Sequence, residues 1–171
     1  MTTKQIHIAL VGNPNAGKST IFNALTGENQ HVGNWPGKTI EHKEGWFTLQ
    51  DLTISLIDLP GAYSLTAYSQ EETITRDYLL QNHPNLVINV LDTANLERNL
   101  YLTVQLLEMG LPTIAVLNMT DITDRRGWHV DETNLQTMLG VPVVKMAARQ
   151  GKGVDALKQQ ILAEATKVTA R

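Results

Sequence analysis

The chain has no cysteine among its 171 residues, which excludes disulfide bonds and thiolate metal sites and fits a reducing compartment. It has no apolar run close to the roughly 18 residues needed to cross a bilayer. Its N-terminus lacks a signal-peptide layout. The formal net charge of -3 lacks the positive excess of a nucleic-acid-binding surface. We therefore expect a soluble, cytoplasmic chain without a nucleic-acid partner.

The hydrophobic content of 42% is ordinary for a globular protein, and the length fits one domain spanning residues 1–171. Apolar strand-like runs alternate with segments of helical period, which predicts an α/β fold with helices on both faces of a sheet. The runs expected as buried, mostly parallel strands are Ile6–Val11, Leu52–Ile57, Leu86–Leu91, Thr113–Leu117 and Val141–Val144. The segments with helical period are 19–25, 95–109, 132–139 and 154–165.

The segment 40–49 is more polar than these runs and is joined to the next strand by Gln50-Asp51. It is typical of an antiparallel edge strand hairpinned to its neighbour. The expected sheet therefore has six strands, mostly parallel, with one antiparallel edge strand.

Residues 12–19 have the spacing G-x-x-x-x-G-K-S of a phosphate-binding loop, between a β-branched strand and a helix. Its N–H groups and the helix N-terminus favour phosphate, Lys18 adds a charge near the β- and γ-phosphates, and Ser19 offers a hydroxyl to Mg²⁺. The nucleotide contacts expected here are Gly12, Asn13, Pro14, Asn15, Ala16, Gly17, Lys18, Ser19 and Thr20. The motif predicts a nucleoside triphosphate site.

A second motif, Asp58-Leu59-Pro60-Gly61, follows the strand 52–57. An aspartate at this point can hold Mg²⁺ through a water, and the Gly61 N–H can bond the γ-phosphate that only a triphosphate carries. All four residues are expected near the nucleotide. Gly61 thus becomes a candidate sensor of the triphosphate.

Base recognition is indicated by Asn118-Met119-Thr120-Asp121, which matches the guanine-reading pattern N-x-x-D at a strand end. The Asp121 carboxylate can accept bonds from N1–H and the exocyclic amine of guanine, both of which adenine lacks. Asn118 would bond N7 and tie this loop to the phosphate loop, while Met119 supplies apolar cover where lysine is usual. These features favour GTP over ATP.

The last base-contacting loop is expected at Ala147-Ala148-Arg149, where the usual pattern is Ser-Ala-x. The Ala148 N–H is the candidate donor to guanine O6. Ala147 lacks the usual serine hydroxyl, so this loop is expected to be less ordered.

The glycine-rich segment 31–39 reads HVGNWPGKT and suits a loop that becomes ordered around γ-phosphate and Mg²⁺. The Thr39 hydroxyl is the candidate second protein ligand of Mg²⁺ beside Ser19. Gly37 and Lys38 are expected to contact nucleotide.

Three further stretches strengthen a family resemblance: residues 32–39, residues 58–65, and Asn95-Leu96-Glu97-Arg98-Asn99-Leu100-Tyr101-Leu102. With the phosphate loop, they resemble the G domain of ferrous iron transport protein B over nearly the whole chain. The resemblance implies a GTPase switch coupled to iron uptake, with switch I at 31–39 and switch II at 61–75. It also implies a place at the cytoplasmic face of the bacterial inner membrane.

Members of that family usually continue into a small helical domain and a transmembrane permease, so we expect this chain to be a fragment or a truncated form. The permease and GTP or GDP are the implied partners, with weak homo-oligomerisation as a further expectation. Glu71 and Glu72 in switch II are expected on a solvated helix face, with a role in hydrolysis or signalling as the alternative. The five histidines show no metal-ligand spacing, so no Fe²⁺ site is expected.

The usual water-positioning glutamine is replaced by Ala62, whose side chain can neither donate nor accept a hydrogen bond. The resemblance to cation-dependent GTPases makes Asn15 a candidate K⁺ ligand, with the carbonyls of Gly33 and Trp35 completing the site. The residues expected to carry catalysis are then Asn15, Lys18, Thr39 and Gly61. A turn-forming role is the alternative for Asn15.

Two other functions stay open at this point. An Era-type RNA- or ribosome-associated GTPase shares the phosphate loop, but that class normally carries a basic RNA-binding module. A nucleotide-gated interaction module that hardly hydrolyses GTP would also explain Ala62.

We predict that Ala147→Ser slows GDP release, because a hydroxyl at this position can order the last base-contacting loop. Stopped-flow measurement of the GDP off-rate would detect the change, and an unaltered off-rate would exclude this explanation of loop order.

Overall fold

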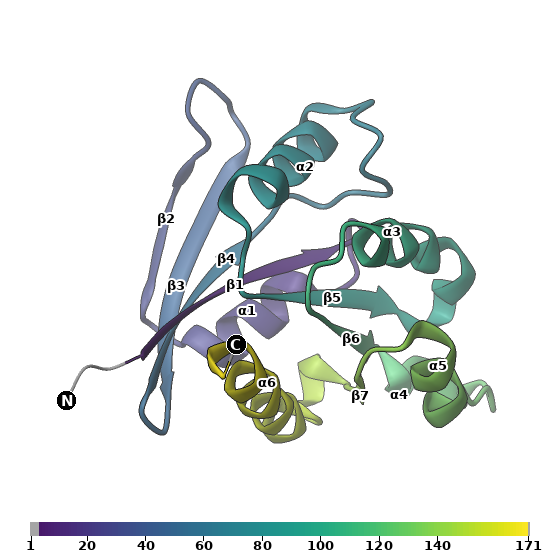
Figure 1. Ribbon diagram of the computed structural model, residues 1–171. Helices are drawn as coiled ribbons and strands as arrows, with labels where there is room; N and C mark the ends of the chain where they lie inside the picture. The colour runs from purple at the N-terminus through teal and green to yellow at the C-terminus, as the bar shows by residue number, and fades with distance from the viewer. Residues whose placement is uncertain (1–3, 171) are drawn as a thin grey trace.

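The computed structural model describes residues 4–170 and consists of a mixed β-sheet with helices on both faces (Figure 1). The strands are β1 (Lys4–Gly12), β2 (Gln30–Asn34), β3 (Glu41–Leu49), β4 (Leu52–Asp58), β5 (Leu86–Asp92), β6 (Thr113–Asn118) and β7 (Val143–Lys145). The α-helices are α1 (Lys18–Thr26), α2 (Gln70–Asn82), α3 (Leu96–Glu108), α4 (Thr120–Arg125), α5 (Glu132–Leu139) and α6 (Val154–Thr169). Short 3₁₀ turns η1 (Thr93–Asn95) and η2 (Ala148–Gln150) follow β5 and β7.

The sheet has the order β2-β3-β4-β1-β5-β6-β7, so β1 lies at its centre. Strand β1 pairs in parallel with β4 and β5, and the parallel pairing continues through β6 to β7. Because the carboxyl ends of parallel strands meet at one edge, the loops after β1, β4, β6 and β7 come together there. This edge carries all the motifs that the sequence singled out except the switch I segment.

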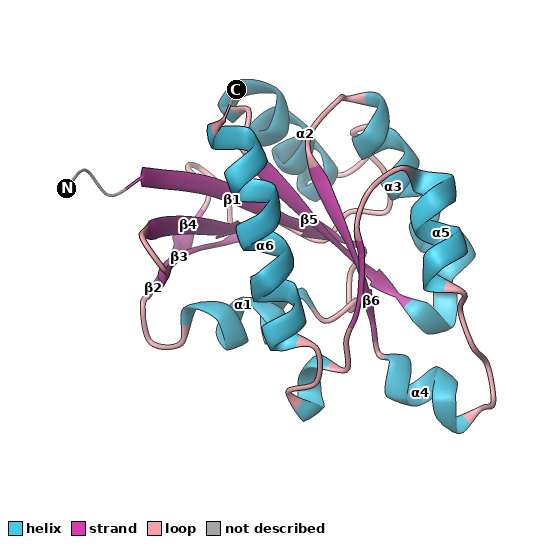
Figure 2. Cartoon of the chain, turned by 60° about the horizontal axis from the view of Figure 1, so that its bottom comes forward, coloured by secondary structure: helices cyan, strands magenta, loops and turns pink. Residues whose placement is uncertain are grey.

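The core is built on both faces of the buried central strands. One face packs against α1 and α6 through side chains such as Phe22, Leu56 and Ile161, and the other packs against α2 and α3 through Leu79 and Leu102. Figure 2 shows these helices lying on opposite sides of the sheet. Strands buried on both faces explain the nearly continuous apolar runs of the sequence.

The three-layer α/β prediction is confirmed, but the strand count is wrong, because the sheet has seven strands rather than six. The additional strand, β2, pairs antiparallel with β3, so two antiparallel strands lie at one edge instead of one. Its sequence QHVGN is polar and mostly exposed, without a run of β-branched residues. Pairing with β3 makes it a strand, a tertiary effect that local propensity does not report.

Other boundaries follow the sequence more closely. The hairpin from β3 to β4 turns at Gln50-Asp51 as predicted, with Leu49 opposite Leu52. Helix α5 begins after Asp131, whose side chain accepts from the Asn134 N–H at 2.9 Å, and ends at Gly140 with φ 70°. The last strand begins two residues later than predicted, because Val141 and Pro142 precede β7.

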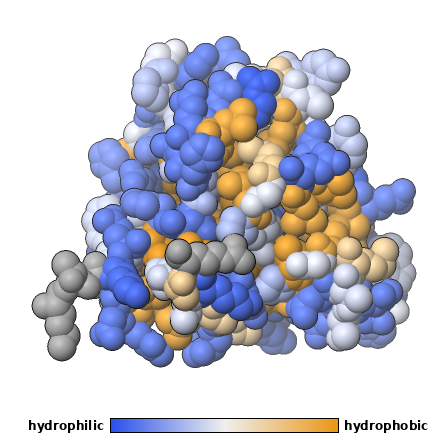
Figure 3. Space-filling model, in the orientation of Figure 1, coloured by the Kyte–Doolittle hydropathy of each residue, from blue (hydrophilic) through white to orange (hydrophobic). Residues whose placement is uncertain are grey.

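Some apolar side chains of α2 and α3 stay exposed, including Leu80 and Val104. In Figure 3 apolar surface gathers over α3 and between α2 and α3, with polar surface around it.

We predict that Gly45→Ala lowers the free energy of unfolding by about 1–3 kcal/mol, the usual effect of overpacking. A Cβ at Gly45 would lie 2.6 Å from Thr26 Cγ2 and 2.9 Å from the Asn29 carbonyl, so β3 would be pushed from α1. Urea unfolding measures the loss. Gly33→Ala on the paired strand β2 is the matched control, because its Cβ would meet nothing closer than 3.9 Å. Equal losses in the two variants would contradict the prediction.

Candidate functional site: a nucleotide cavity at the carboxyl edge of the sheet

The phosphate loop joins β1 to α1 and has a compact backbone. The Ala16 N–H donates to the Asn13 carbonyl at 3.2 Å, and Gly17 has φ 96°. A Cβ at Gly17 would collide with the amide nitrogen of Asn118, so the second glycine of the motif allows two loops to touch. The N-terminus of α1, which begins at Lys18, therefore faces the cavity with its N–H groups free for an anion.

Asn15 also has a left-handed backbone, with φ 63°, and its side chain is exposed. Asparagine tolerates this conformation better than most residues. The loop thus holds the Asn15 side chain at the mouth of the cavity rather than in the core.

Lys18 and Asp58 form an ion pair with 3.8 Å between Nζ and Oδ1, and both side chains are nearly buried. Burial raises the pKa of Asp58 above its usual value, while the charges of Lys18 and Lys43 oppose the rise. The same oxygen, Oδ1, is buried without a hydrogen-bond partner. A buried carboxylate oxygen without a donor is suited to a cation or a cation-bound water.

The start of switch II is fastened to the phosphate loop. The Leu59 N–H donates to the Leu10 carbonyl and the Ala62 N–H to the Gly12 carbonyl, both at 3.1 Å. A Cβ at Gly61 would lie 2.9 Å from Pro14 Cα, so this close approach requires glycine. Pro60 lies between them, and its carbonyl accepts from the Thr75 hydroxyl at 3.0 Å. Ala62 is 1% exposed and belongs to the buried apolar residues.

The expectation that Glu72 lies on a solvated helix face is wrong. The residue is 7% exposed rather than solvated, and its carboxylate accepts from the Tyr68 N–H at 3.0 Å and the Ser64 hydroxyl at 3.3 Å. Glu71 is exposed, as expected. The switch II loop folds back over the first turn of α2, which turns Glu72 inward.

Helix α3 supplies two contacts to switch II that the sequence analysis did not identify. Gln105 accepts from the Leu65 N–H at 2.7 Å, and the Arg98 guanidinium lies 4.4 Å from the centre of the Tyr63 ring. The two residues are seven apart, and so share one face of α3. Arg98 belongs to a stretch already noted in the sequence, but its partner depends on how the switch II loop folds.

The guanine-reading loop is tied to its neighbours by Asn118, which is 3% exposed. Its Nδ2 donates to the Ala16 carbonyl at 3.0 Å, and its Oδ1 accepts from the Ala148 N–H at 3.1 Å. One side chain thus joins the phosphate loop, the loop after β6 and the loop after β7. The Ala148 N–H is already bonded within the protein, so it is not free for guanine O6 in this arrangement.

Met119 caps α4 with φ 62°, and Asp121 lies in the first turn of that helix. The Asp121 carboxylate accepts from Arg125 at 3.1 Å and from Gln150 at 3.4 Å. Ala147, which replaces the usual serine, is 3% exposed, and its N–H donates to the Lys152 carbonyl at 3.1 Å.

These loops surround a cavity of about 370 Å³. Its lining residues are Asn15, Gly17, Lys18, Ser19, Thr20, Asn118, Met119, Asp121, Ile122, Arg125, Ala148 and Arg149. The structure thus brings together the phosphate loop and both base-contacting loops. Asp58 and Gly61 adjoin it through Lys18 and Pro14.

The switch I residues are not at this cavity. Gly33 lies in β2 opposite His42, and the Trp35 carbonyl accepts from the Lys38 N–H at 2.9 Å in the turn that carries Gly37 and leads to Thr39. Figure 1 shows the turn between β2 and β3 projecting away from the end of β1, where the phosphate loop begins. In this conformation none of these residues lies beside Ser19 or Asn15.

The Trp35 side chain holds switch I against the body of the protein. Its ring lies 4.6 Å from the His42 ring and 6.0 Å from the Tyr78 ring, both edge-on. Its indole nitrogen is buried without a hydrogen-bond partner, a cost that a rearrangement of switch I could relieve.

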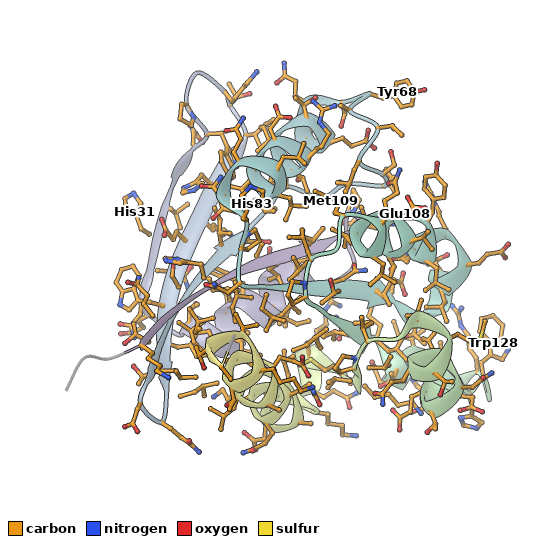
Figure 4. The ribbon with its side chains drawn as sticks, viewed as in Figure 1. His31, Tyr68, His83, Glu108, Met109 and Trp128 are labelled. Carbon is orange, nitrogen blue, oxygen red and sulfur yellow. The ribbon has the colours of Figure 1, made fainter. Side chains whose placement is uncertain are left out.

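The histidines do not converge. Figure 4 places His31 on the outer side of β2 and His83 near the end of α2, well apart. Within residues 4–170 no group of three or more His, Asp or Glu side chains could hold a metal ion. In the same part of the chain no helix is long and apolar enough to cross a membrane.

The phosphate loop, the Asp58-to-Gly61 motif, the N-x-x-D loop and the sheet order together define a P-loop GTPase domain. The family model of ferrous iron transport protein B matches residues 6–161. The chain belongs to this family and corresponds to its G domain, as its sequence resemblance indicated.

Individual relatives agree with this assignment. The Fe(2+) transporter FeoB of Salmonella typhimurium is 51% identical over 162 residues, which are 92% of this chain and 21% of that protein. The chain therefore spans about a fifth of the length of the curated relatives it matches. An Era-type function is not favoured by these relatives.

Solved structures give the same picture. The FeoB G domain of Methanococcus jannaschii is 45% identical, with a TM-score of 0.85, and the match covers 95% of this chain and 99% of that one. The cytosolic domain of T. maritima FeoB in a GDP form is 47% identical with a TM-score of 0.91, covering 95% of this chain and 64% of that one.

We predict that the Asp58 carboxyl lowers the free energy of unfolding of the nucleotide-free protein increasingly as the pH rises above 3.8, the ordinary pKa of an aspartate. The unfolded chain releases this proton before the folded one does, so stability falls through the interval up to the raised pKa. Asp58→Asn keeps the side chain neutral. Its advantage in free energy of unfolding over the unsubstituted protein should grow with pH and then level off.

Urea unfolding between pH 4 and pH 7, without nucleotide or Mg²⁺, tests this expectation. Asp51→Asn, which removes an exposed carboxylate in the β3–β4 turn, is the control. An advantage of Asp58→Asn that is constant or shrinks with pH would contradict the assigned cause.

Proposed function

We propose that this chain, as a single G domain over residues 1–171, binds GTP with Mg²⁺ and hydrolyses it to GDP and phosphate. We propose further that it acts as the cytoplasmic switch of a Fe²⁺ transporter at the bacterial inner membrane. The observation that carries the proposal is the cavity in which the phosphate loop and Asp121 face the same space. The permease of the same full-length protein is its proposed partner, with no nucleic acid and at most weak self-association.

Mg²⁺ fits the residues present. The buried Asp58 oxygen without a partner is an acceptor for a cation-bound water, and the Ser19 hydroxyl lies at the start of α1 beside Lys18. Thr39 would supply a second hydroxyl once switch I has moved. When bound, Mg²⁺ neutralises charge on the β- and γ-phosphates.

The proposed nucleotide contacts are those derived from the sequence, with roles divided among the loops. Lys18 and the phosphate loop 12–20, through its backbone N–H groups other than at Pro14, hold the phosphates. Residues 58–61 report on the γ-phosphate. Gly37, Lys38 and Thr39 join them from switch I. Asn118, Met119 and Asp121, with residues 147–149, surround the base.

Catalysis needs a replacement for the missing glutamine, since Ala62 is buried and inert. Asn15 is an exposed residue of the cavity lining, where its amide oxygen can help hold K⁺ against the phosphates. An arginine finger contributes about 10³–10⁵ in rate, and K⁺ there would supply part of this. The carbonyls of Gly33 and Trp35 can complete the shell only after leaving their present positions.

Switch I must therefore detach from β3 for the complete site to form. Strand β2 has only one neighbour and is largely exposed, so few apolar contacts oppose its release. Contacts of Thr39 with Mg²⁺ and of two carbonyls with K⁺ would favour the relocated state, which only the triphosphate makes available.

We predict that GTP turnover is faster in K⁺ than in Na⁺ at the same ionic strength, by about tenfold or more. Asn15→Gly should abolish most of this difference, because it removes the side-chain oxygen and still permits the positive φ. Phosphate release under single-turnover conditions measures the rates.

The control variant is Asn134→Gly, an exposed asparagine on α5 remote from the cavity, which should keep the K⁺ response. Equal rates in K⁺ and Na⁺ would reject the K⁺ role. GTP binding without measurable turnover in either salt would identify a nucleotide-gated interaction module instead of an enzyme.

A further inference from the structure

The Asp121 carboxylate is held from two sides. Arg125 donates from Nη2 to Oδ2 at 3.1 Å and from Nε to the Asp121 main-chain carbonyl at 3.1 Å. Gln150 donates from Nε2 to the same Oδ2 at 3.4 Å. Both donors thus converge on one carboxylate oxygen.

The two donors come from different parts of the fold. Arg125 is one helical turn beyond Asp121 on α4, whereas Gln150 lies in η2, after β7. The Gln150 contact is therefore a further link between the loops after β6 and β7, in addition to the bonds from Ala148 to Asn118 and from Thr120 to the Met146 carbonyl. This contact is made to Asp121, the side chain proposed to recognise the base.

We propose that Arg125 and Gln150 are positioning residues that set the preference for guanine over hypoxanthine; this proposal rests on the GTP-binding function proposed above. The terminal torsion of an aspartate is broad, so a free carboxylate turns easily. Guanine offers two donors side by side, N1–H and the 2-amino group, and needs both carboxylate oxygens in one plane. The hydrogen bonds from Arg125 and Gln150 to Oδ2 fix that plane.

The carboxylate has enough acceptor capacity for this arrangement. An ionised carboxylate offers about four lone-pair sites, two on each oxygen. Oδ2 can therefore accept from Arg125 and from one donor of the base, with Gln150 at 3.4 Å as a longer third contact, while Oδ1 accepts the other donor of the base. The Arg125 donor is charged, and hydrogen bonds between a guanidinium and a carboxylate are among the stronger ones.

Because the Arg125–Asp121 ion pair is exposed, its effect on nucleotide binding can be measured apart from its effect on folding stability. The Arg125 side chain is 74% exposed and that of Asp121 is 25% exposed. Surface pairs of this kind contribute little to folding. Removing Arg125 should therefore leave the protein folded and alter nucleotide selection.

Hypoxanthine is the informative comparison, because it keeps N1–H and O6 but lacks the 2-amino group. If Arg125 fixes the carboxylate plane, its loss weakens the two-bond contact with guanine more than the one-bond contact with hypoxanthine. The ratio of the IDP Kd to the GDP Kd then falls. If Arg125 only adds positive charge near the phosphates, both ligands weaken equally and the ratio is unchanged.

The test is calorimetric titration of the chain with GDP and with IDP in Mg²⁺ buffer, for the unsubstituted protein, Arg125→Ala and Gln150→Ala. Arg125→Ala should weaken GDP by about 3- to 30-fold and lower the Kd ratio at least about threefold, as for loss of a charged hydrogen bond. Gln150→Ala should change the ratio in the same direction by less. Urea midpoints of all variants should agree with that of the unsubstituted protein.

Arg126→Ala is the matched control, because it removes the same charge from the next residue, which instead lies over the Trp128 ring at 5.3 Å. Its Kd ratio should equal that of the unsubstituted protein. A ratio unchanged in Arg125→Ala, or lowered equally in Arg126→Ala, would overturn the positioning role. Failure of the unsubstituted protein to bind either nucleotide would instead refute the proposed function.

Discussion

The nucleotide cavity depends on the side-chain amide of Asn118. Its nitrogen bonds the phosphate loop at Ala16 and its oxygen bonds the last base loop at Ala148, so one buried group joins three segments far apart in the sequence. A buried amide is costly unless its hydrogen bonds are made, and here both of its ends are bonded. Gly17 completes the arrangement, because any side chain there would displace Asn118.

This connection joins only the phosphate loop and the two loops proposed to contact the base. The half of the site that would contact a γ-phosphate consists of switch II and switch I. Switch II is held by hydrogen bonds to Glu72 and to Gln105 of α3. Switch I is paired with β3 and held by the Trp35 ring. The two halves are thus held by separate sets of contacts. That division suits a domain whose conformation reports which nucleotide is bound.

The sequence located the loops that line the cavity but not the conformations of switch I and switch II. Motifs such as G-x-x-x-x-G-K-S act through local backbone geometry at the end of a buried strand, and both the strand and the loop can be read from neighbouring residues. The segment 30–34 becomes a strand only because β3 lies beside it. Glu72 was expected in solvent, because its burial depends on a loop that folds back from residues 64–68.

The sequence by itself determined the α/β architecture, the phosphate loop, the guanine-reading pattern and the missing glutamine, since each depends on residue type at fixed spacing. Only the tertiary structure decided that Asp58 is left with an unpartnered oxygen, that switch I lies away from the cavity, and that Arg125 and Gln150 meet on Asp121. The reason is distance along the chain. Contacts between segments brought together by the sheet order leave no periodic or local trace in the sequence.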